Sequence, residues 1–309
     1  MKKVRLLLPY LLGWALLMST ASLLEMSFIN GVLQMTLFLF VVCIPAWKTG
    51  RMSYVDIGWP WGLVLIGVVT LVLGEGYWLR NLLVSAVYIF MGLRMGMFAA
   101  KMWRVGAFKT ELPRYLFQHR RWEKAGETNK PLAMQVEVLA QGLANASFLA
   151  MPAFIIGSNS SEVLSWFEIA GLLLWVAAFM VESISDIQKQ NFLKAMRRSG
   201  EKNGVCNVGL WRYSRHPNYF AEWMVWNALI IAAIPSLLAL MSVESTAQSL
   251  LLGAGLVFTS RIMYVTLVYY TGAVPAEFYS VQKRPQYREY QQTTNMFFPG
   301  KYRPTEKQS

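Results

Sequence analysis

The densest group of chemically useful side chains lies between residues 209 and 222, which read GLWRYSRHPNYFAE. Pro217 suits the first position of a helix, because its missing N–H costs nothing there. The free backbone N–H groups of a helix start, with Arg212 and Arg215 nearby, could hold an anion such as a phosphate. The alternative is a membrane-entry loop with aromatic rings at the interface and arginines on lipid headgroups. Composition alone leaves both interpretations open.

A second group consists of ionisable residues at or inside the ends of apolar segments, where an unpaired charge is costly. The group is Asp56, Arg94, Glu137, Glu182, Asp186, Glu222, Arg261 and Glu277. Glu182 and Asp186 are four residues apart, so one helix face carries both carboxylates. A polar cavity that opens to one side of a membrane would gather such groups. Helix ends that are simply hydrated in the headgroup region would also explain them.

Asp56 stands at the start of an apolar segment, two residues after Tyr54. An acid at a helix start accepts hydrogen bonds from free N–H groups and suits the helix dipole, which is the simpler interpretation. Tyr54 and Asp56 are also close enough to form an acid pair in a cavity.

The composition shows what kind of protein must position these residues. The chain has 309 residues, of which 55% are hydrophobic and only 15% charged, with a mean hydropathy of +0.35. This balance excludes an ordinary soluble domain and a disordered chain. Eight segments are apolar over about the 20 residues that a membrane helix needs. They are residues 6–24, 28–47, 56–74, 77–99, 133–156, 163–185, 218–241 and 249–270.

The positions of the cations support this count. The net charge is +12, and all of the 29 Lys and Arg except Arg80, Arg94 and Arg261 lie in five stretches, at 2–5, 48–51, 101–130, 189–215 and 283–307. If all eight segments cross, every one of these stretches faces the same side, as the positive-inside rule requires. We therefore predict an all-α polytopic bundle of seven or eight membrane helices with both termini in the cytoplasm. A nucleic-acid partner is not expected, because the cations form no continuous stripe interleaved with stacking aromatic residues.

Residues 2–22 resemble a signal peptide, but the apolar run continues past the usual length and its loss would invert the charge alternation. We expect this segment to remain as an anchor. The two cysteines, Cys43 and Cys206, provide neither a disulfide framework nor a metal site. The tail after residue 272 is rich in aromatic residues, so we expect it to pack back against the cytoplasmic face. We divide the chain into N-terminal membrane helices (1–50) and a main membrane domain (51–309).

The stretch 209–222 closely resembles the signature of the steroid 5-alpha-reductase-like family of bacterial membrane proteins. The helix end at 182–194, the tail from Gly272 through RPQYREYQQTTNMFFP, and the stretches YVDIGW (54–59) and GLRMG (92–96) are similar to that family as well. The resemblance covers about residues 50–300 and is most specific over 180–300.

Related steroid and sterol reductases are helical-bundle oxidoreductases that take hydride from NADPH to reduce an activated C=C bond. The resemblance implies an inner-membrane protein with a cofactor cleft in its C-terminal part (180–300) that faces the cytosol. It also implies a hydrophobic small-molecule or lipid substrate that enters from the membrane lipids, and no required protein partner. The residues that would line the cofactor site are Asp186, Arg212, Tyr213, Arg215, His216, Asn218, Tyr219 and Glu222. Lys194, Arg284 and Tyr287 would hold the phosphates or the adenosine, and Arg94 and Glu277 would complete the cleft.

In the steroid reductases, a glutamate–tyrosine pair polarises the enone oxygen. The resemblance points to Asp56 in place of the glutamate, with Tyr54 as the tyrosine and Tyr88 as the alternative. Methyltransferases of isoprenylcysteine and of phospholipids share an R-H-P-x-Y…E element that holds S-adenosylmethionine, which makes a membrane methyltransferase the first alternative. Those families usually have paired glutamates where this chain has Glu277 alone. A lipid-binding membrane protein without catalysis is the second alternative.

Overall fold

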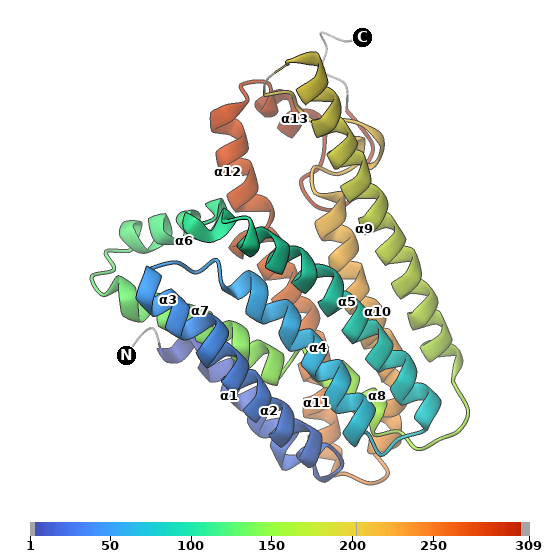
Figure 1. Cartoon of the computed structure of the whole chain (residues 1–309). Coiled ribbons are helices and arrows are strands. Elements are labelled where there is room, and N and C mark those ends of the chain that lie inside the picture. The colour runs from blue at the N-terminus through green and yellow to red at the C-terminus, as the bar shows by residue number, and fades with distance from the viewer. Residues whose placement is uncertain (1–3, 202, 304–309) are drawn as a thin grey trace. The chain divides into compact units, whose positions relative to one another are not determined.

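The computed structural model describes residues 4–201 and 203–303, and the described residues form helices without any strand (Figure 1). The N-terminal helices are α1 (Leu8–Ser19), α2 (Leu24–Phe38), α3 (Ile44–Thr49), α4 (Val55–Leu73) and α5 (Trp78–Arg104). The middle of the chain forms α6 (Pro113–Lys124), α7 (Lys130–Ala146), α8 (Met151–Gly157) and α9 (Trp166–Ser199). The C-terminal helices are α10 (Pro217–Leu240), α11 (Thr246–Val265), α12 (Ala273–Lys283) and α13 (Tyr287–Thr293).

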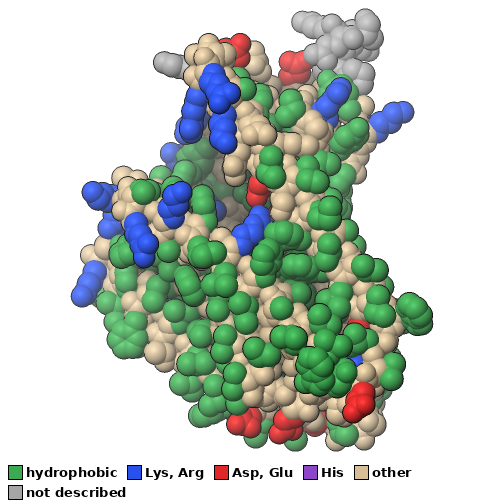
Figure 2. Space-filling model, turned by 45° about the vertical axis from the view of Figure 1, so that its right-hand side comes forward, with side chains coloured by type: hydrophobic (Ala, Val, Ile, Leu, Met, Phe, Trp, Pro, Cys, Tyr) green, Lys and Arg blue, Asp and Glu red, His purple; other side chains and the backbone are tan. Residues whose placement is uncertain are grey.

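Seven helical stretches within the described residues are long and apolar enough to cross a membrane. They are Ala21–Thr49, Val55–Leu73, Trp78–Arg104, Lys130–Gly157, Trp166–Ser199, Pro217–Leu240 and Thr246–Lys283. The predicted all-α bundle of seven or eight membrane helices is thus confirmed with seven. In Figure 2, hydrophobic side chains cover much of the visible surface, as lipid-facing helices require.

The predicted segment 6–24 does not form a continuous membrane helix. α1 has 12 residues and ends where Thr20 takes an extended conformation. At 1.5 Å per residue such a helix is about 18 Å long, which is shorter than a bilayer core of about 30 Å. α1 instead packs beside α2, where the Trp14 indole N–H donates to the Ser27 carbonyl over 3.0 Å.

The helices fall into two compact units, which we describe separately. Unit 1 comprises the described residues up to Ala170 and residues 229–259, and unit 2 comprises residues 171–228 and the described residues from Ser260 onward. Most of the membrane helices lie in unit 1, while the 209–222 stretch and the aromatic tail lie in unit 2.

The charge pattern predicted from the sequence appears in the contacts of unit 1. At one end, Arg51 donates to the carbonyl of Lys109, so the cation-rich stretches 48–51 and 101–130 lie together. At the opposite end, the Ser22 hydroxyl donates to Glu244 over 2.7 Å, and the Tyr77 N–H donates to the Asn159 carbonyl over 2.9 Å. The loops near residues 22, 77, 159 and 244 therefore meet at the end away from those cations. The assignment of the cation-rich end to the cytoplasm stays a prediction.

Candidate functional site

The 209–222 stretch in unit 2 is fixed to α9 by its first residues. Gly209 has a φ of +54°, a left-handed conformation that favours glycine. The turn lets the Leu210 N–H donate to the Gln188 side chain over 2.9 Å, and the Trp211 indole donates to the Ser185 carbonyl over 3.0 Å. The chain then enters α10 at Pro217, as the sequence predicts. Residues 209–216 therefore form a tight loop against α9.

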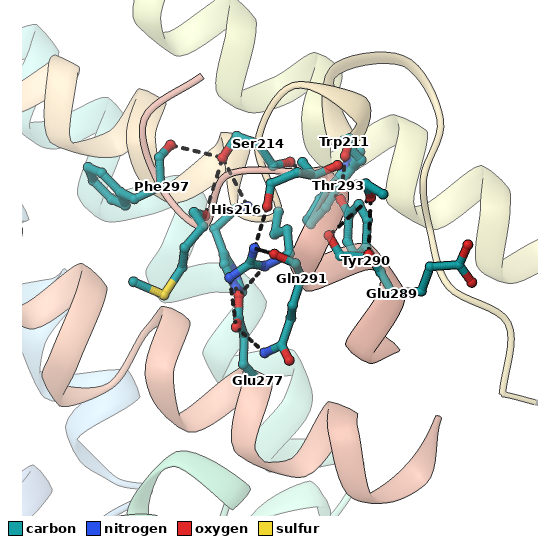
Figure 3. A network of polar contacts seen from close by, with 12 residues as sticks. Trp211, Ser214, His216, Glu277, Glu289, Tyr290, Gln291, Thr293 and Phe297 are labelled. Atoms are coloured by element: carbon teal, nitrogen blue, oxygen red, sulfur yellow. Dashed lines mark hydrogen bonds and ion pairs between the residues drawn. The ribbon is translucent and has the colours of Figure 1, made fainter. Parts of the chain in front are cut away.

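A buried ion pair joins this loop to α12. Arg215 donates from Nε and Nη2 to the two carboxylate oxygens of Glu277 over 2.7 and 3.0 Å. The His216 ring contacts Glu277 Oε1 over 3.1 Å, and the Gln291 amide donates to Oε2 over 2.7 Å. Figure 3 shows His216 and Gln291 on two sides of the Glu277 carboxylate. Arg215, His216 and Glu277 are at most 8% exposed, so this cluster is an internal network.

The same loop carries the C-terminal tail. The Arg215 backbone N–H donates to the Asn295 carbonyl over 2.8 Å, and the Ser214 hydroxyl donates to the Phe297 carbonyl over 2.8 Å. The Gly300 N–H donates to the Tyr213 carbonyl over 2.9 Å. The tail thus packs back, as predicted, and it does so on the 209–216 loop.

These contacts determine what Arg215 and His216 do chemically. The positive charge of Arg215 is neutralised by Glu277. Burial lowers the pKa of His216, and the nearby Arg215 acts in the same direction, while the hydrogen bond to Glu277 opposes both. Arg215, His216 and Glu277 therefore fix the loop and the tail in position, and they do not present a charge to a ligand from solution.

α12 begins after a glycine that the close approach of the chain requires. A Cβ atom on Gly272 would lie 1.9 Å from the carbonyl oxygen of Leu267. The π-helical turn Thr266–Tyr270 directly precedes it. Such turns are frequent at functional sites.

Four further predicted cofactor residues lie on α9 and in the first two turns of α10. The Asn218 amide donates to the Asp186 carboxylate over 3.2 Å. The Tyr219 ring stacks on His216 with centroids 5.2 Å apart and planes at 1°. The oxygen of the Asn218 amide is buried without a hydrogen-bond partner, and Glu222 lies one turn further along α10, half-buried. Asp186, Asn218 and Tyr219 thus adjoin the network without belonging to its ion pair.

The remaining predicted residues of unit 2 are cations and tyrosines around this network. Arg212 is exposed and lies over the ring of Tyr302, and Tyr213 is 53% exposed. Lys194 is exposed on α9 and Arg284 is half-buried at the end of α12. Tyr287 is buried, and burial raises the pKa of its phenol. The structure therefore brings the predicted residues of α9, the loop and the tail together in one unit.

In unit 1, the partner of Asp56 differs from the predicted one. Asp56 accepts a hydrogen bond from the Tyr115 phenol over 2.6 Å and pairs with Arg114. The ring of Tyr54 instead makes an edge-to-face contact with the ring of Phe108. The alternative tyrosine, Tyr88, is fully buried and donates to the Leu149 carbonyl over 2.7 Å. Asp56 thus has a tyrosine beside it, but this tyrosine comes from α6.

The sequence interpretation missed α6 because it is too short and too charged to cross a membrane. Tyr115, Gln118 and Trp122 recur at helical spacing and are buried together. Gln118 and Trp122 donate to the Glu137 carboxylate over 2.6 and 3.2 Å. The helical spacing of these three amphipathic side chains was the signal in the sequence that could have predicted α6. Arg94, on α5, is half-buried in the same unit, and its predicted place in a cofactor cleft stays a prediction.

The loop before α6 is fixed by a single carboxylate, that of Glu111. Its oxygens accept from the backbone N–H groups of Met52 and Ser53 over 2.5 and 3.1 Å, and from the Ser53 hydroxyl. Burial raises the pKa of Glu111, but these hydrogen bonds and one with His119 outweigh it, so the pKa lies below the ordinary value.

A lowered pKa makes the stability of this end of unit 1 depend on pH. Glu111 stabilises the fold above its unfolded-state pKa, and this contribution is lost as the pH falls through its folded-state pKa. We expect thermal unfolding between pH 7 and 3 to show a loss of stability that Glu111→Gln makes much smaller. Glu123→Gln, at an exposed carboxylate on α6, is the control and should retain the loss. The same loss in Glu111→Gln as in the unchanged protein would contradict this role.

Comparison with known proteins places the chain in a family. The model of the family described as "Protein of unknown function (DUF1295)" matches residues 40–294. No curated protein and no solved structure matches the chain. The matched range includes Asp56, the 209–222 loop, Glu277 and α13. The chain therefore belongs to the DUF1295 family of proteins of unknown function.

Proposed function

We propose that this chain is a membrane-embedded oxidoreductase that uses NADPH to reduce an activated C=C bond in a lipid or steroid-like substrate. The observation that carries the proposal is the convergence within unit 2. Residues near 186, 215, 277 and 290, which are far apart in the sequence, form one polar cluster. These stretches are those in which the chain resembles the steroid 5-alpha-reductase-like family. The resemblance supports the assignment of this cluster to a cofactor.

The residues of unit 2 fit a dinucleotide. Arg212, Lys194 and Arg284 are cations for phosphates, and Asp186 with Asn218 offers hydrogen-bonding groups for a ribose or an amide. The buried, unpartnered oxygen of Asn218 and the unpartnered Nε of Arg284 are polar atoms that a ligand would satisfy. When bound, NADPH supplies the hydride. Arg215, His216 and Glu277 keep the loop and the tail in place around it.

Reduction of a C=C bond also needs a proton. The resemblance implies that Asp56 and a tyrosine form the pair that supplies it, and the tyrosine that donates to Asp56 within unit 1, over 2.6 Å, is Tyr115. Burial, and then the charge of Asp56, raise the pKa of Tyr115, so the phenol keeps its proton at neutral pH. This replaces Tyr54 as the tyrosine of the pair. The positive-inside rule and the cation-rich helix ends support a bacterial inner-membrane protein whose site faces the cytoplasm.

The proposal is tested by ligand-dependent stability, because a ligand that binds the native state raises it. NADPH is expected to raise the Tm of the purified protein in detergent, while S-adenosylmethionine is not. His216→Ala and Glu222→Gln should weaken the response to NADPH, and His119→Ala, at the only other histidine, should retain it. Stabilisation by S-adenosylmethionine without any by NADPH would favour a methyltransferase and overturn the reductase.

A further inference from the structure

α6 connects α5 to α7 at the cation-rich end of unit 1, and its two faces differ in character. The inner face consists of the buried side chains Tyr115, Gln118 and Trp122. Tyr115 donates to Asp56 in the first turn of α4, and the other two donate to Glu137 on α7. These contacts fix which face of α6 is turned away from the protein.

The outer face of α6 combines cations with an apolar side chain. Leu116, Arg120 and Lys124 are all exposed, and their spacing of four residues places them on one face of the helix. The acid of α6, Glu123, forms an ion pair with Lys130 over 2.8 Å. The outer face therefore carries a net positive charge beside an exposed leucine.

The same mixture of side chains stands at the end of α5 and at the start of α7, the helices that α6 connects. In the last turn of α5, Lys101 and Arg104 are exposed, and so is Trp103 between them. In the first turn of α7, Leu132 is exposed two residues after Lys130. Cations interleaved with exposed aromatic and aliphatic side chains are typical of the membrane–water interface, where the charge meets headgroups and the apolar part enters the acyl boundary.

The depth of this surface follows from the membrane helices on either side of it. One apolar stretch ends at Arg104 and the next begins at Lys130, so residues 105–129 leave the membrane and return to it at the level of the headgroups. The positive-inside rule requires only that such a segment lies on one side of the membrane, without contact to lipid. An acidic protein would be matched by the cations alone. The exposed apolar side chains among the cations favour a lipid surface instead.

We propose that the outer face of α6, together with the adjoining ends of α5 and α7, is a docking surface for anionic phospholipids of the membrane. Arg120 and Lys124 bind lipid phosphates, and Leu116 beside them lies at the acyl boundary. Lipid on the outer face leaves the inner face in contact with Asp56 and Glu137. Binding therefore stabilises α6 on unit 1, and it requires no nucleotide.

The test compares nanodiscs of phosphatidylcholine with nanodiscs that also contain phosphatidylglycerol, and the readout is the difference in Tm between the two. Hydrogen exchange at the end of α6 locates the effect, because the N–H groups of Ala125 and Gly126 close its last turn. The double variant Arg120→Gln/Lys124→Gln removes two charges from the outer face. Arg120→Lys/Lys124→Arg retains both charges at the same positions.

The matched control is Arg197→Gln/Arg198→Gln, which removes two exposed charges from the last turn of α9. α9 has 34 residues. At 1.5 Å per residue it is about 51 Å long, whereas a bilayer with its headgroups is about 40–45 Å thick. The last turn of α9 therefore reaches beyond the lipid phosphates, and its arginines should contribute little to lipid binding.

We expect phosphatidylglycerol to raise the Tm of the unchanged protein and to slow exchange at Ala125 and Gly126. Each cation strengthens binding to an anionic surface roughly fivefold, so the loss of two should weaken it roughly 25-fold and abolish most of the Tm shift. The charge-retaining variant and the α9 variant should keep the shift, and salt at about 1 M should suppress it.

Two results would overturn the docking surface: no Tm shift with phosphatidylglycerol in the unchanged protein, or an equal loss of the shift in the α6 and α9 variants. Stabilisation by soluble polyglutamate without any by phosphatidylglycerol would assign the surface to an acidic protein and overturn the lipid. None of these results depends on NADPH, so the docking surface and the reductase proposal are tested separately.

Discussion

Arg215→Met is expected to lower the free energy of unfolding of unit 2 by about 3–5 kcal/mol, because it leaves the Glu277 carboxylate buried without its main partner. Arg215 also donates to the Gln291 carbonyl over 3.1 Å and to the Thr294 carbonyl, so both acceptors lose a donor as well. Hydrogen exchange measures the effect locally. The backbone N–H groups of Arg215 and Gly300 form hydrogen bonds between the loop and the tail. Both should exchange much faster in the variant.

The matched control for this change is Arg212→Met, three residues earlier on the same loop. The Arg212 side chain is exposed and lies over the ring of Tyr302, so its loss should change stability by no more than about 0.5 kcal/mol. Unchanged exchange in Arg215→Met would show that the ion pair does not hold the tail.

The second large effect is expected from Arg80→Met, at the end of unit 1 that lies away from the cation-rich stretches. Arg80 is 2% exposed and pairs with Glu168 through Nε and Nη2. Its remaining donors bond the carbonyls of Asn159, Ser161 and Val163. One guanidinium thus ties the whole 159–168 loop to α5. Its removal should cost about 3–5 kcal/mol, measured as the fall in Tm and in the denaturant midpoint in detergent.

Glu162→Gln provides the comparison for Arg80→Met, since this exposed carboxylate lies in the same loop. It should leave the unfolding midpoint nearly unchanged. The unfolding midpoint of Glu168→Gln should lie between those of Arg80→Met and Glu162→Gln, because the amide retains one acceptor for Arg80. If Arg80→Met has the same Tm and denaturant midpoint as Glu162→Gln, contacts other than those of Arg80 hold the loop.

The membrane helices were predictable because their signal is simple. A run of about twenty apolar residues usually forms a membrane helix. The cations at 48–51 and 101–130 indicate which helix ends of unit 1 lie on the same side. α1 was the exception, because apolar composition does not show where a helix breaks. The extended backbone at Thr20, whose hydroxyl bonds the Leu16 carbonyl, ends the helix within an apolar run.

Which residues meet in unit 2 was predictable from the sequence, but the contacts that each of them makes were not. The motif around His216 and the tail with Glu277 identified residues that do meet in unit 2. Whether Arg215 faces a ligand or a carboxylate depends on a contact across 62 residues of sequence, which spacing cannot show. The tyrosine beside Asp56 was missed for the same reason, since Tyr115 comes from a helix that hydropathy does not mark.

Transfer of an isotope from cofactor to lipid tests the central claim most directly. The purified protein is incubated with a bacterial lipid extract and either NADPH deuterated at C4 of the nicotinamide or S-adenosylmethionine with a deuterated methyl group. The reductase proposal predicts that one lipid gains one deuterium from NADPH and one proton from solvent, and loses one double bond. A lipid that gains the deuterated methyl group, with no deuterium transferred from NADPH, would contradict it.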